Sequence, residues 1–171
     1  EKEYVNTAVD STWISGGQFI DKFEKELAQK LNLKNAFVVS NGTAALQLAF
    51  LTIDIKPGDE VIVPAFGFLA AANVLKLMHA TPVFVDVDEL NWCMNPKKIQ
   101  ESITKKTKAI LAIHNYGVVT DMEQLSIIAK NNNLYLIEDC AESIFSKYKN
   151  IDCGTFGDIS TFSFHATKTI S

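Results

Sequence analysis

The sequence predicts an α/β fold in which helices cover both faces of a mainly parallel β-sheet. Apolar strand-like segments alternate along the chain with segments of helical periodicity, an order typical of parallel sheets. The strand-like segments are continuous apolar runs rather than alternating apolar and polar residues, as expected for strands that are buried on both faces. With 171 residues, of which 47% are hydrophobic and 21% charged, the chain is long enough for one domain with a sizeable core.

The first elements are predicted from periodicity and turn residues. Residues 1–17 show no regular pattern and are expected to be irregular. An amphipathic helix should follow, because apolar residues recur there at helical spacing; these are Ile20, Phe23, Leu27 and Leu31. Residues 35–39 predict a short buried strand, and the turn at 40–43 leads into a second helix. That helix, from residue 44 to about 52, is apolar nearly all round and is expected to be buried.

The remaining elements continue the alternation of strands and helices. The predicted strands span residues 60–63, 81–87, 108–114, 134–137 and 159–164. The predicted helices span residues 68–78, 96–102 and about 120–131. Residues 145–157 are expected to form turns and short extended pieces. Pro96 stands at the first position of its helix, where proline is tolerated, and Thr120 and Glu123 have the spacing of a capping box.

Composition limits the possible partners and cellular environments. A formal net charge of −4 favours neither nucleic acid nor an anionic membrane as partner. The three cysteines offer no CxxC pair and no disulfide framework, so a reducing, cytoplasmic compartment is expected. We predict no metal site. The uncharged stretch 61–75 is too short to span a bilayer, and residues 1–4 do not resemble a signal peptide.

The chemically interesting side chains all follow predicted strands. In open α/β sheets, ligands collect beyond the carboxyl ends of the strands. The segments concerned are residues 40–43, 66–68, 114, 139–142 and 163–168. Their placement predicts a single site at one edge of the sheet.

A turn formed by Asn41, Gly42, Thr43 and Ala44 leads from a predicted strand into a helix. Its free backbone N–H groups, the helix dipole and the hydroxyl of Thr43 favour a phosphate, although such turns often only connect two elements. The sequence contains neither GxGxxG nor GxxxxGK followed by Ser or Thr. This absence argues against a Rossmann dinucleotide site, a P-loop and a generic nucleotide-binding domain.

Two acids and one aromatic ring supply the groups that a flat heteroaromatic cofactor needs. The pair Glu138-Asp139 follows a predicted strand, where it either caps a helix or, through Asp139, pairs with a ring nitrogen and keeps that nitrogen protonated. Glu142 lies three residues further on and either reaches the same ring or is a surface acid. Phe68 is either an ordinary core aromatic or a ring that stacks on the cofactor.

Lys168 closes the last apolar run and gives the site its covalent chemistry. Such a lysine is usually an edge residue that reaches for water, but its neighbours favour a role as the covalent anchor of pyridoxal 5′-phosphate (PLP). Ser163 lies five residues before it and is placed to hold the phosphate. His165 is either a core histidine or a minor member of the site, and His114 is expected to be a structural histidine rather than a substrate contact.

Taken together, these residues resemble those of the DegT/DnrJ/EryC1/StrS family of PLP-dependent sugar aminotransferases. The matching stretches run along nearly the whole chain and keep the family's order and spacing. They comprise residues 13–15, 40–46, 57–64, 81–88, 107–110, 114–117, 137–142, 154–158 and 162–168. The resemblance implies the large domain of the aspartate aminotransferase fold (fold type I), with residues 1–171 as its major part and the C-terminal domain absent from this chain.

The resemblance also implies the roles of individual residues. Lys168 would carry the cofactor, Asp139 would pair with its pyridinium nitrogen, and Phe68 would stack on its ring. The phosphate would be held by Gly42, Thr43, Ala44 and Ser163. Glu142 stands where many family members have glutamine, which resembles the perosamine-synthase branch, whose members act on C4 of a nucleotide-linked 4-keto-6-deoxyhexose.

The implied reaction moves an amino group from glutamate to the keto-sugar, and the implied enzyme is a homodimer. Two departures from the family pattern concern packing near the cofactor: Phe145-Ser146 replaces a usual Gly-Ala or Gly-Ser step, and Gly67 replaces a usual threonine. Family members are about twice as long as this chain, which ends three residues after Lys168. A non-catalytic binding or oligomerising fragment is therefore an alternative, as is a dehydratase relative, in which histidine replaces the lysine.

Overall fold

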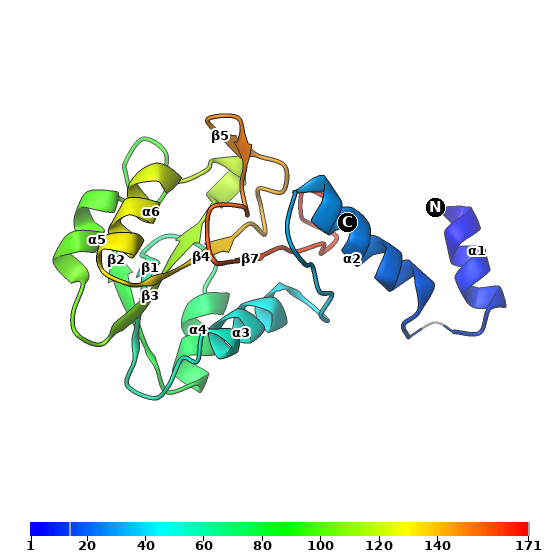
Figure 1. Ribbon diagram of the computed structural model, residues 1–171, viewed down its shortest axis with the longest axis horizontal. Coiled ribbons are helices and arrows are strands. Elements are labelled where there is room, and N and C mark those ends of the chain that lie inside the picture. The colour runs from blue at the N-terminus through cyan, green and yellow to red at the C-terminus, as the bar shows by residue number, and fades with distance from the viewer. Residues whose placement is uncertain (14, 171) are drawn as a thin grey trace. The chain divides into compact units, whose positions relative to one another are not determined.

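The computed structural model describes residues 1–13 and 15–170. The chain divides into two units, Glu1–Val38 and Val39–Ser171, which are described separately. The first holds two helices, and the second holds a parallel sheet with its covering helices (Figure 1). Ile14, which belongs to the matching stretch at residues 13–15, lies outside the described residues, as does Ser171.

The first unit contains α1 (Lys2–Asp10) and α2 (Gln18–Lys30). The helix expected from the periodic apolar residues is confirmed as α2, but the prediction of an irregular start is wrong because α1 forms there. Tyr4 packs on Phe19 of α2 with ring centroids 5.3 Å apart, and its hydroxyl accepts a hydrogen bond from Lys22 at 3.0 Å. Helices as short as α1 are marginal alone, and contacts with a second helix stabilise them.

Residues 35–39 do not form the predicted strand. They pair with no strand in the part of the chain that the structure describes, and Phe37 keeps 75% of its surface exposed. The N–H of Val38 donates to Glu24 Oε1 at 2.7 Å instead of to a neighbouring strand. A short apolar run is ambiguous without periodicity, which is why the prediction failed.

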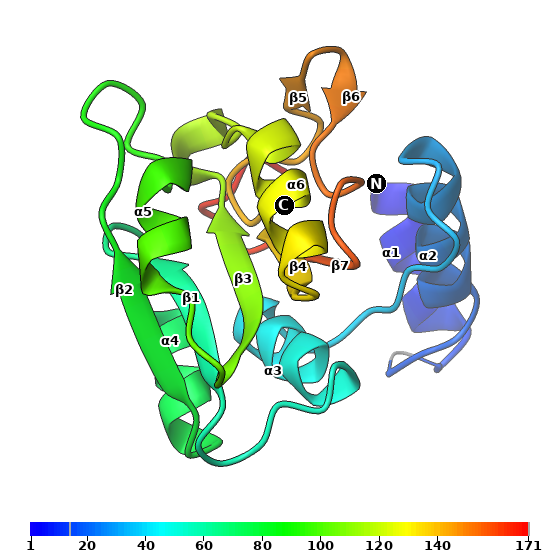
Figure 2. The ribbon, with the colours of Figure 1, turned by 60° about the vertical axis from the view of Figure 1, so that its left-hand side comes forward.

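Five parallel strands form the sheet of the second unit, in the order β2–β1–β3–β4–β7 (Figure 2). Their bounds are β1 Glu60–Pro64, β2 Thr81–Val85, β3 Thr107–Ile113, β4 Tyr135–Asp139 and β7 Ile159–Thr161. The parallel sheet expected from the continuous apolar runs is confirmed. The last strand ends at Thr161 rather than at residue 164, because its pairing with β4 stops there.

Helices cover both faces of this sheet, as predicted. They are α3 (Gly42–Thr52), α4 (Ala70–Leu77), α5 (Pro96–Ser102) and α6 (Met122–Asn131). One apolar core joins α3 and α4 to the sheet and includes Phe50 and Leu75, and the other joins α5 and α6 and includes Ile99 and Leu125. The prediction that α3 is buried is confirmed only in part, since Phe50 is buried whereas Leu48 is exposed. None of the helices in the described ranges has the length and apolar character needed to cross a membrane.

The cap of α6 lies one residue later than predicted. Asp121 is the N-cap, and its Oδ1 accepts the N–H of Gln124 at 3.2 Å. Thr120 is buried and its hydroxyl lies 3.3 Å from Nδ1 of His114. Because this hydroxyl is engaged by the histidine, the predicted capping box does not form.

A two-stranded hairpin follows β4 and consists of β5 (Lys147–Tyr148) and β6 (Ile151–Asp152). It confirms the short extended pieces expected over residues 145–157. The two turn residues, Lys149 and Asn150, have φ values of 49° and 68°. Two-residue hairpin turns favour this left-handed backbone, which glycine adopts most easily.

Replacing Asn150 with glycine is expected to raise the free energy of unfolding by about 0.5 kcal/mol, because glycine tolerates the left-handed backbone better than asparagine. Urea unfolding followed by circular dichroism measures the change. Asn131→Gly is the matched control: Asn131 ends α6 with helical backbone, so the same replacement should lower stability by up to about 1 kcal/mol. A lower urea midpoint for Asn150→Gly would contradict the prediction.

Candidate active site

Lys168 lies in the turn after β7, and its amine faces groups from two other strand ends. Its Nζ lies 2.9 Å from Glu142 Oε1 and 5.9 Å from the centroid of the Phe68 ring. Glu142 follows β4, and Phe68 follows β1. The structure thus brings together three predicted site residues from three loops, at the edge of the sheet where the sequence places them.

Local hydrogen bonds hold the turn that carries Lys168. The N–H of Lys168 donates to the carbonyl of His165 at 2.8 Å, and Nδ1 of His165 lies 3.0 Å from the hydroxyl of Thr167. His165 is exposed, so the alternative of a core histidine is wrong.

Glu142 connects Lys168 to the loop after β3. Its Oε2 accepts the N–H of Tyr116, in the short 3-10 helix η1 (Asn115–Gly117), at 3.1 Å. Partial burial favours the neutral acid, but the hydrogen bonds from Lys168 and from the N–H of Tyr116 outweigh it and lower the pKa of Glu142. Glu142 is therefore the negatively charged partner of the lysine, and it is partly buried rather than a freely exposed surface acid.

Asp139 is almost fully buried at the end of β4 and keeps 7% of its surface exposed. Its Oδ1 accepts the N–H of Ala141 at 3.0 Å, whereas Oδ2 receives no hydrogen bond from any residue that the structure describes. Burial raises the pKa of Asp139, and the N–H of Ala141 and nearby positive charge, including Lys168, offset this only in part. Residues 141–145 form turns, so the alternative role as a helix cap is wrong.

The predicted phosphate turn is the N-terminus of α3. Asn41 is the N-cap, and its Oδ1 accepts the N–H of Ala44 at 2.8 Å. The expectation that Ala44 offers a free N–H is therefore wrong. The N–H groups of Gly42 and Thr43 have no acceptor among the described residues, as is usual for the first turn of a helix.

Gly42 allows Ser163 to approach the start of α3. A Cβ on Gly42 would lie 3.2 Å from Cβ and 3.5 Å from Oγ of Ser163, so a larger residue would push the serine away. The structure therefore places the hydroxyl of Ser163 beside the first turn of α3, although the two segments are far apart in the sequence. Together they form a set of donors suited to an anion.

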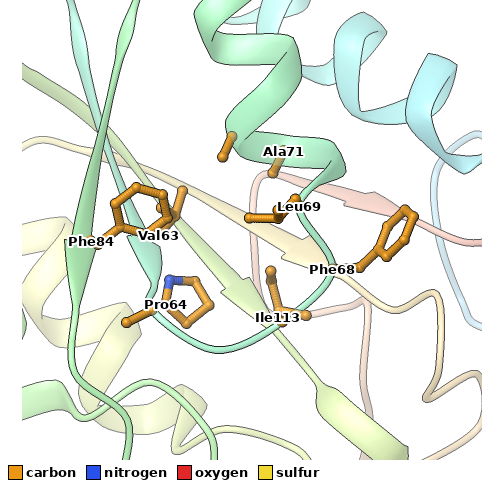
Figure 3. Close-up of a pocket in the computed structure, with 10 residues that line it drawn as sticks. Val63, Pro64, Phe68, Leu69, Ala71, Phe84 and Ile113 are labelled. Carbon is orange, nitrogen blue, oxygen red and sulfur yellow. The ribbon is translucent and has the colours of Figure 1, made fainter.

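Phe68 is 74% exposed, so the alternative of a core aromatic is wrong. Figure 3 shows its ring standing clear of Val63 and Phe84, which lie at the far side of an apolar hollow beside β1. The hollow has a volume of about 20 Å³, which is room for one water molecule and not for a cofactor ring. The hollow is therefore too small for a flat ligand, and the face of the Phe68 ring that such a ligand could reach is the exposed one.

The backbone explains one of the two departures from the family pattern, Gly67, and not the other, Phe145. Gly67 has a φ of 151°, and a Cβ at this position would lie 3.1 Å from Cδ1 of Ile113. Glycine therefore suits the loop that carries Phe68. Phe145 has a φ of 64°, a left-handed conformation that glycine adopts more easily than phenylalanine.

Behind the site, His114 and Glu138 form a fully buried pair. Nε2 of His114 lies 3.0 Å from Oε2 of Glu138, and Nδ1 faces Thr120. The prediction of a structural histidine is confirmed. Burial opposes ionisation of Glu138, but hydrogen bonds from His114 and from backbone N–H groups outweigh it and lower the pKa of Glu138. Sequence reasoning treated Glu138 only as the neighbour of Asp139 and missed this role.

Cys140 lies next to the buried pair, and donor atoms of His114, Glu138 and Cys140 lie within 4.8 Å of one another. Such a cluster has the composition of a metal site. Each carboxylate oxygen of Glu138, however, already accepts two hydrogen bonds, which fill its lone pairs. The donors are the ring of His114 and the N–H groups of Gly154, Phe156 and Gly157. Hydrogen bonding, rather than a metal ion, therefore accounts for the cluster.

Comparisons with known proteins agree with this geometry. A model of the DegT/DnrJ/EryC1/StrS aminotransferase family matches residues 1–171. The chain is 54% identical to GDP-perosamine synthase of Escherichia coli O157:H7, and the alignment covers 100% of this chain and 47% of that protein. The chain thus spans about half the length of this curated relative.

Solved structures of aminotransferases share the fold. An aminotransferase from Psychrobacter cryohalolentis matches with a TM-score of 0.94 and 36% identity, over 99% of this chain and 44% of that one. NtdA from Bacillus subtilis, whose structure contains the bound cofactor PMP, matches with a TM-score of 0.91 and 33% identity, over 99% of this chain and 39% of that one. The fold type I architecture expected from the sequence is confirmed by these matches.

Proposed function

Because the chain belongs to the DegT/DnrJ/EryC1/StrS aminotransferase family, we propose that it forms the cofactor-binding part of a PLP-dependent sugar aminotransferase. The main support is the meeting of an amine, an acid and an exposed aromatic ring, supplied by Lys168, Glu142 and Phe68. The bound cofactor of a related structure supports a cofactor of this kind.

The residues of the site fit the chemistry of PLP. Oδ2 of Asp139 has no partner within the described ranges and suits the pyridine nitrogen. Phe68 offers an exposed face for stacking, and Ser163 with the first turn of α3 offers donors for the phosphate. The residues proposed to hold the cofactor are Gly42, Thr43, Ala44, Phe68, Asp139, Glu142, Ser163 and Lys168. Ala44 contributes through its position in the turn, since Asn41 takes its N–H.

Lys168 is the proposed catalytic residue and has two tasks. Its amine would hold the cofactor by condensing with the aldehyde carbon, with the carbonyl oxygen lost as water, and the same amine, when free, would take a proton from the α-carbon of the amino donor. When bound, the cofactor supplies an electron sink for the charge left on that carbon. Glu142 positions the amine, and the carboxylate of Asp139 keeps the ring nitrogen protonated.

We further propose glutamate as the amino donor and a nucleotide-linked keto-deoxyhexose as the acceptor, aminated at C4 of a 4-keto-6-deoxy sugar. The similarity to GDP-perosamine synthase supports this substrate class. The product would serve amino-sugar or surface-polysaccharide biosynthesis. The whole protein is proposed to act as a homodimer in the cytoplasm, where the three free cysteines Cys93, Cys140 and Cys153 would stay reduced.

Reconstitution with PLP tests the proposal. Added PLP should give a yellow, borohydride-sensitive adduct with the chain, and added glutamate should bleach it while 2-oxoglutarate appears. Absorbance spectra and an assay of 2-oxoglutarate measure the two steps. Absence of the adduct would favour the second candidate, a non-catalytic binding or oligomerising fragment, which is considered because the chain spans about half of its relative.

Replacing Asp139 with asparagine is expected to weaken PLP binding about 10- to 100-fold, because a charge-assisted hydrogen bond to the ring nitrogen is lost. A titration with PLP, followed by the absorbance of the adduct, measures the Kd. Asp152→Asn is the matched control, since the Asp152 carboxylate pairs with Lys147 on the hairpin, and this variant should bind PLP normally. Equal Kd values for Asp139→Asn and the unchanged chain would exclude the proposed pairing.

A further inference from the structure

Three aromatic side chains form a cluster beside the proposed site and take no part in the chemistry assigned above. This aromatic cluster consists of Phe66, Trp92 and Tyr116. The ring of Phe66 meets that of Trp92 edge-on with centroids 5.0 Å apart, and lies 6.3 Å from that of Tyr116. Trp92 keeps 51% of its surface exposed, and Tyr116 keeps 72%. Large apolar side chains that are exposed next to one another often mark a binding site.

Asn115, which is buried, holds the aromatic cluster in place. Its side-chain amide donates to the carbonyls of Phe66 at 3.3 Å and of Trp92 at 3.4 Å, so one side chain joins the loops that follow β1, β2 and β3. Trp92 and Tyr116 have φ values of 59° and 54°, a left-handed backbone that is unfavourable for aromatic residues. The fold thus maintains an unfavourable backbone at two exposed rings, a combination typical of functional sites.

The aromatic cluster is continuous with the proposed catalytic lysine. The N–H of Tyr116 donates to Oε2 of Glu142 at 3.1 Å, and Oε1 of Glu142 lies 2.9 Å from Nζ of Lys168. A substrate whose sugar reacts at Lys168 therefore has the rest of its structure within reach of these rings. In a nucleotide-linked sugar, that remainder is a diphosphate bridge, a ribose or deoxyribose, and a base, and the base is the part with a flat π face.

We propose that the aromatic cluster binds the base of the nucleotide-linked substrate by stacking, with Tyr116 and Trp92 as the stacking rings. This assignment rests on the proposed function, which brings a nucleotide to this edge of the sheet. Stacking of bases on aromatic side chains is strong and tolerates different bases. The aromatic cluster therefore supplies affinity for nucleotides as a class and does not select one base.

Tryptophan fluorescence provides a direct test. The chain has two tryptophans, Trp13 and Trp92, so Trp13→Phe leaves Trp92 as the only tryptophan. In this variant, GDP, UDP and dTDP are each titrated while the emission of Trp92 is recorded. At least one nucleotide should quench the emission in a saturable manner. Pyrophosphate and ribose 5-phosphate, which lack a base, should leave it unchanged at the same concentrations.

A second variant locates the binding site. Tyr116→Asn, in the Trp13→Phe background, removes a stacking ring and introduces a residue that tolerates left-handed backbone. It should weaken nucleotide binding about ten-fold. Tyr135→Asn is the matched control, because Tyr135 is exposed at the first residue of β4 and Asp139 is the last; its affinity should be unchanged. Urea unfolding verifies that both variants are folded.

Several outcomes would overturn the assignment. These are a lack of quenching by every nucleotide, equal quenching by pyrophosphate or ribose 5-phosphate, and equal affinity in Tyr116→Asn and its control. A change of Trp92 emission with protein concentration, without any effect of nucleotides, would also overturn it and would indicate that a second copy covers the aromatic cluster. If the chain forms the yellow PLP adduct but no nucleotide quenches Trp92, the proposed function stands and the assignment of the aromatic cluster is wrong. If a nucleotide quenches Trp92 but no adduct forms, the result counts against the proposed function.

Discussion

Replacing Lys168 with alanine is expected to abolish the yellow PLP adduct and to reduce turnover of the whole protein by about 1,000-fold or more. The variant lacks both the amine that bonds to the aldehyde and the base that moves the proton. Absorbance spectra before and after borohydride treatment measure the adduct. Mass spectrometry of the reduced protein identifies the residue that carries the cofactor.

Two control variants separate the covalent role of Lys168 from its charge. Lys168→Arg keeps a positive charge beside Glu142, which lies 2.9 Å from the lysine amine, but a guanidinium cannot take over the covalent bond; it should also lack the adduct. Lys147→Ala removes an exposed lysine that pairs with Asp152 and should keep the adduct. An unchanged, borohydride-sensitive chromophore in Lys168→Ala would contradict the assignment.

Replacing Glu138 with alanine is expected to lower the free energy of unfolding by about 3–5 kcal/mol. The change leaves the buried ring of His114, the buried N–H of Gly154 and two partly buried N–H groups without their acceptor. Urea unfolding measures the loss. Glu123→Ala is the matched control, because Glu123 forms an exposed ion pair with Lys149 and should cost no more than about 1 kcal/mol. If Glu138→Ala lowered the free energy of unfolding as little as the control does, the hydrogen bonds to Glu138 would not stabilise the fold.

The pH dependence of stability follows from the same group. The pKa of Glu138 is lowered in the folded chain, so ionised Glu138 adds to the free energy of unfolding. This stabilisation is fully present at pH values above the pKa of glutamate in the unfolded chain, about 4.3, and is lost as the pH falls through the folded pKa. The raised pKa of Asp139 has the opposite effect, because the stabilisation from protonated Asp139 is lost as the pH rises through its folded pKa. The stability difference between the unchanged chain and Glu138→Gln should therefore shrink on acidification below about pH 4; a growing difference would contradict this.

The parallel sheet could be predicted because strands buried on both faces leave a readable pattern of continuous apolar runs. The strand order β2–β1–β3–β4–β7 could not, since pairing depends on contacts between segments far apart in the chain. Local patterns failed where tertiary contacts decide the outcome. Helix α1 forms against α2 through Tyr4 and Phe19, while the apolar residues 35–39 find no strand to pair with in the described ranges and leave Phe37 exposed.

The candidate site could be predicted in outline, because parallel strands bring their carboxyl ends to one edge. The different surroundings of the side chains of Glu138 and Asp139 were not predicted, although successive residues of a strand point to opposite faces of a sheet. This alternation separates the acid that binds His114 from the acid that faces the site. The capping of Ala44 by Asn41 depends on one side-chain conformation, which sequence patterns do not specify.

The position of β7 in the sheet bears on how a bound ligand would change the stability of this chain. β7 has three residues and, among the described strands, pairs with β4 alone; within this chain, one neighbouring strand therefore attaches the segment that carries Ser163 and Lys168 to the sheet. Local opening of such a segment costs less free energy than opening of β3, which lies between two strands. A ligand that contacts this segment as well as Asp139 and Gly42 would bind only while the segment is closed. Its binding would therefore raise the free energy of local opening, and the segment would become more resistant to proteolysis.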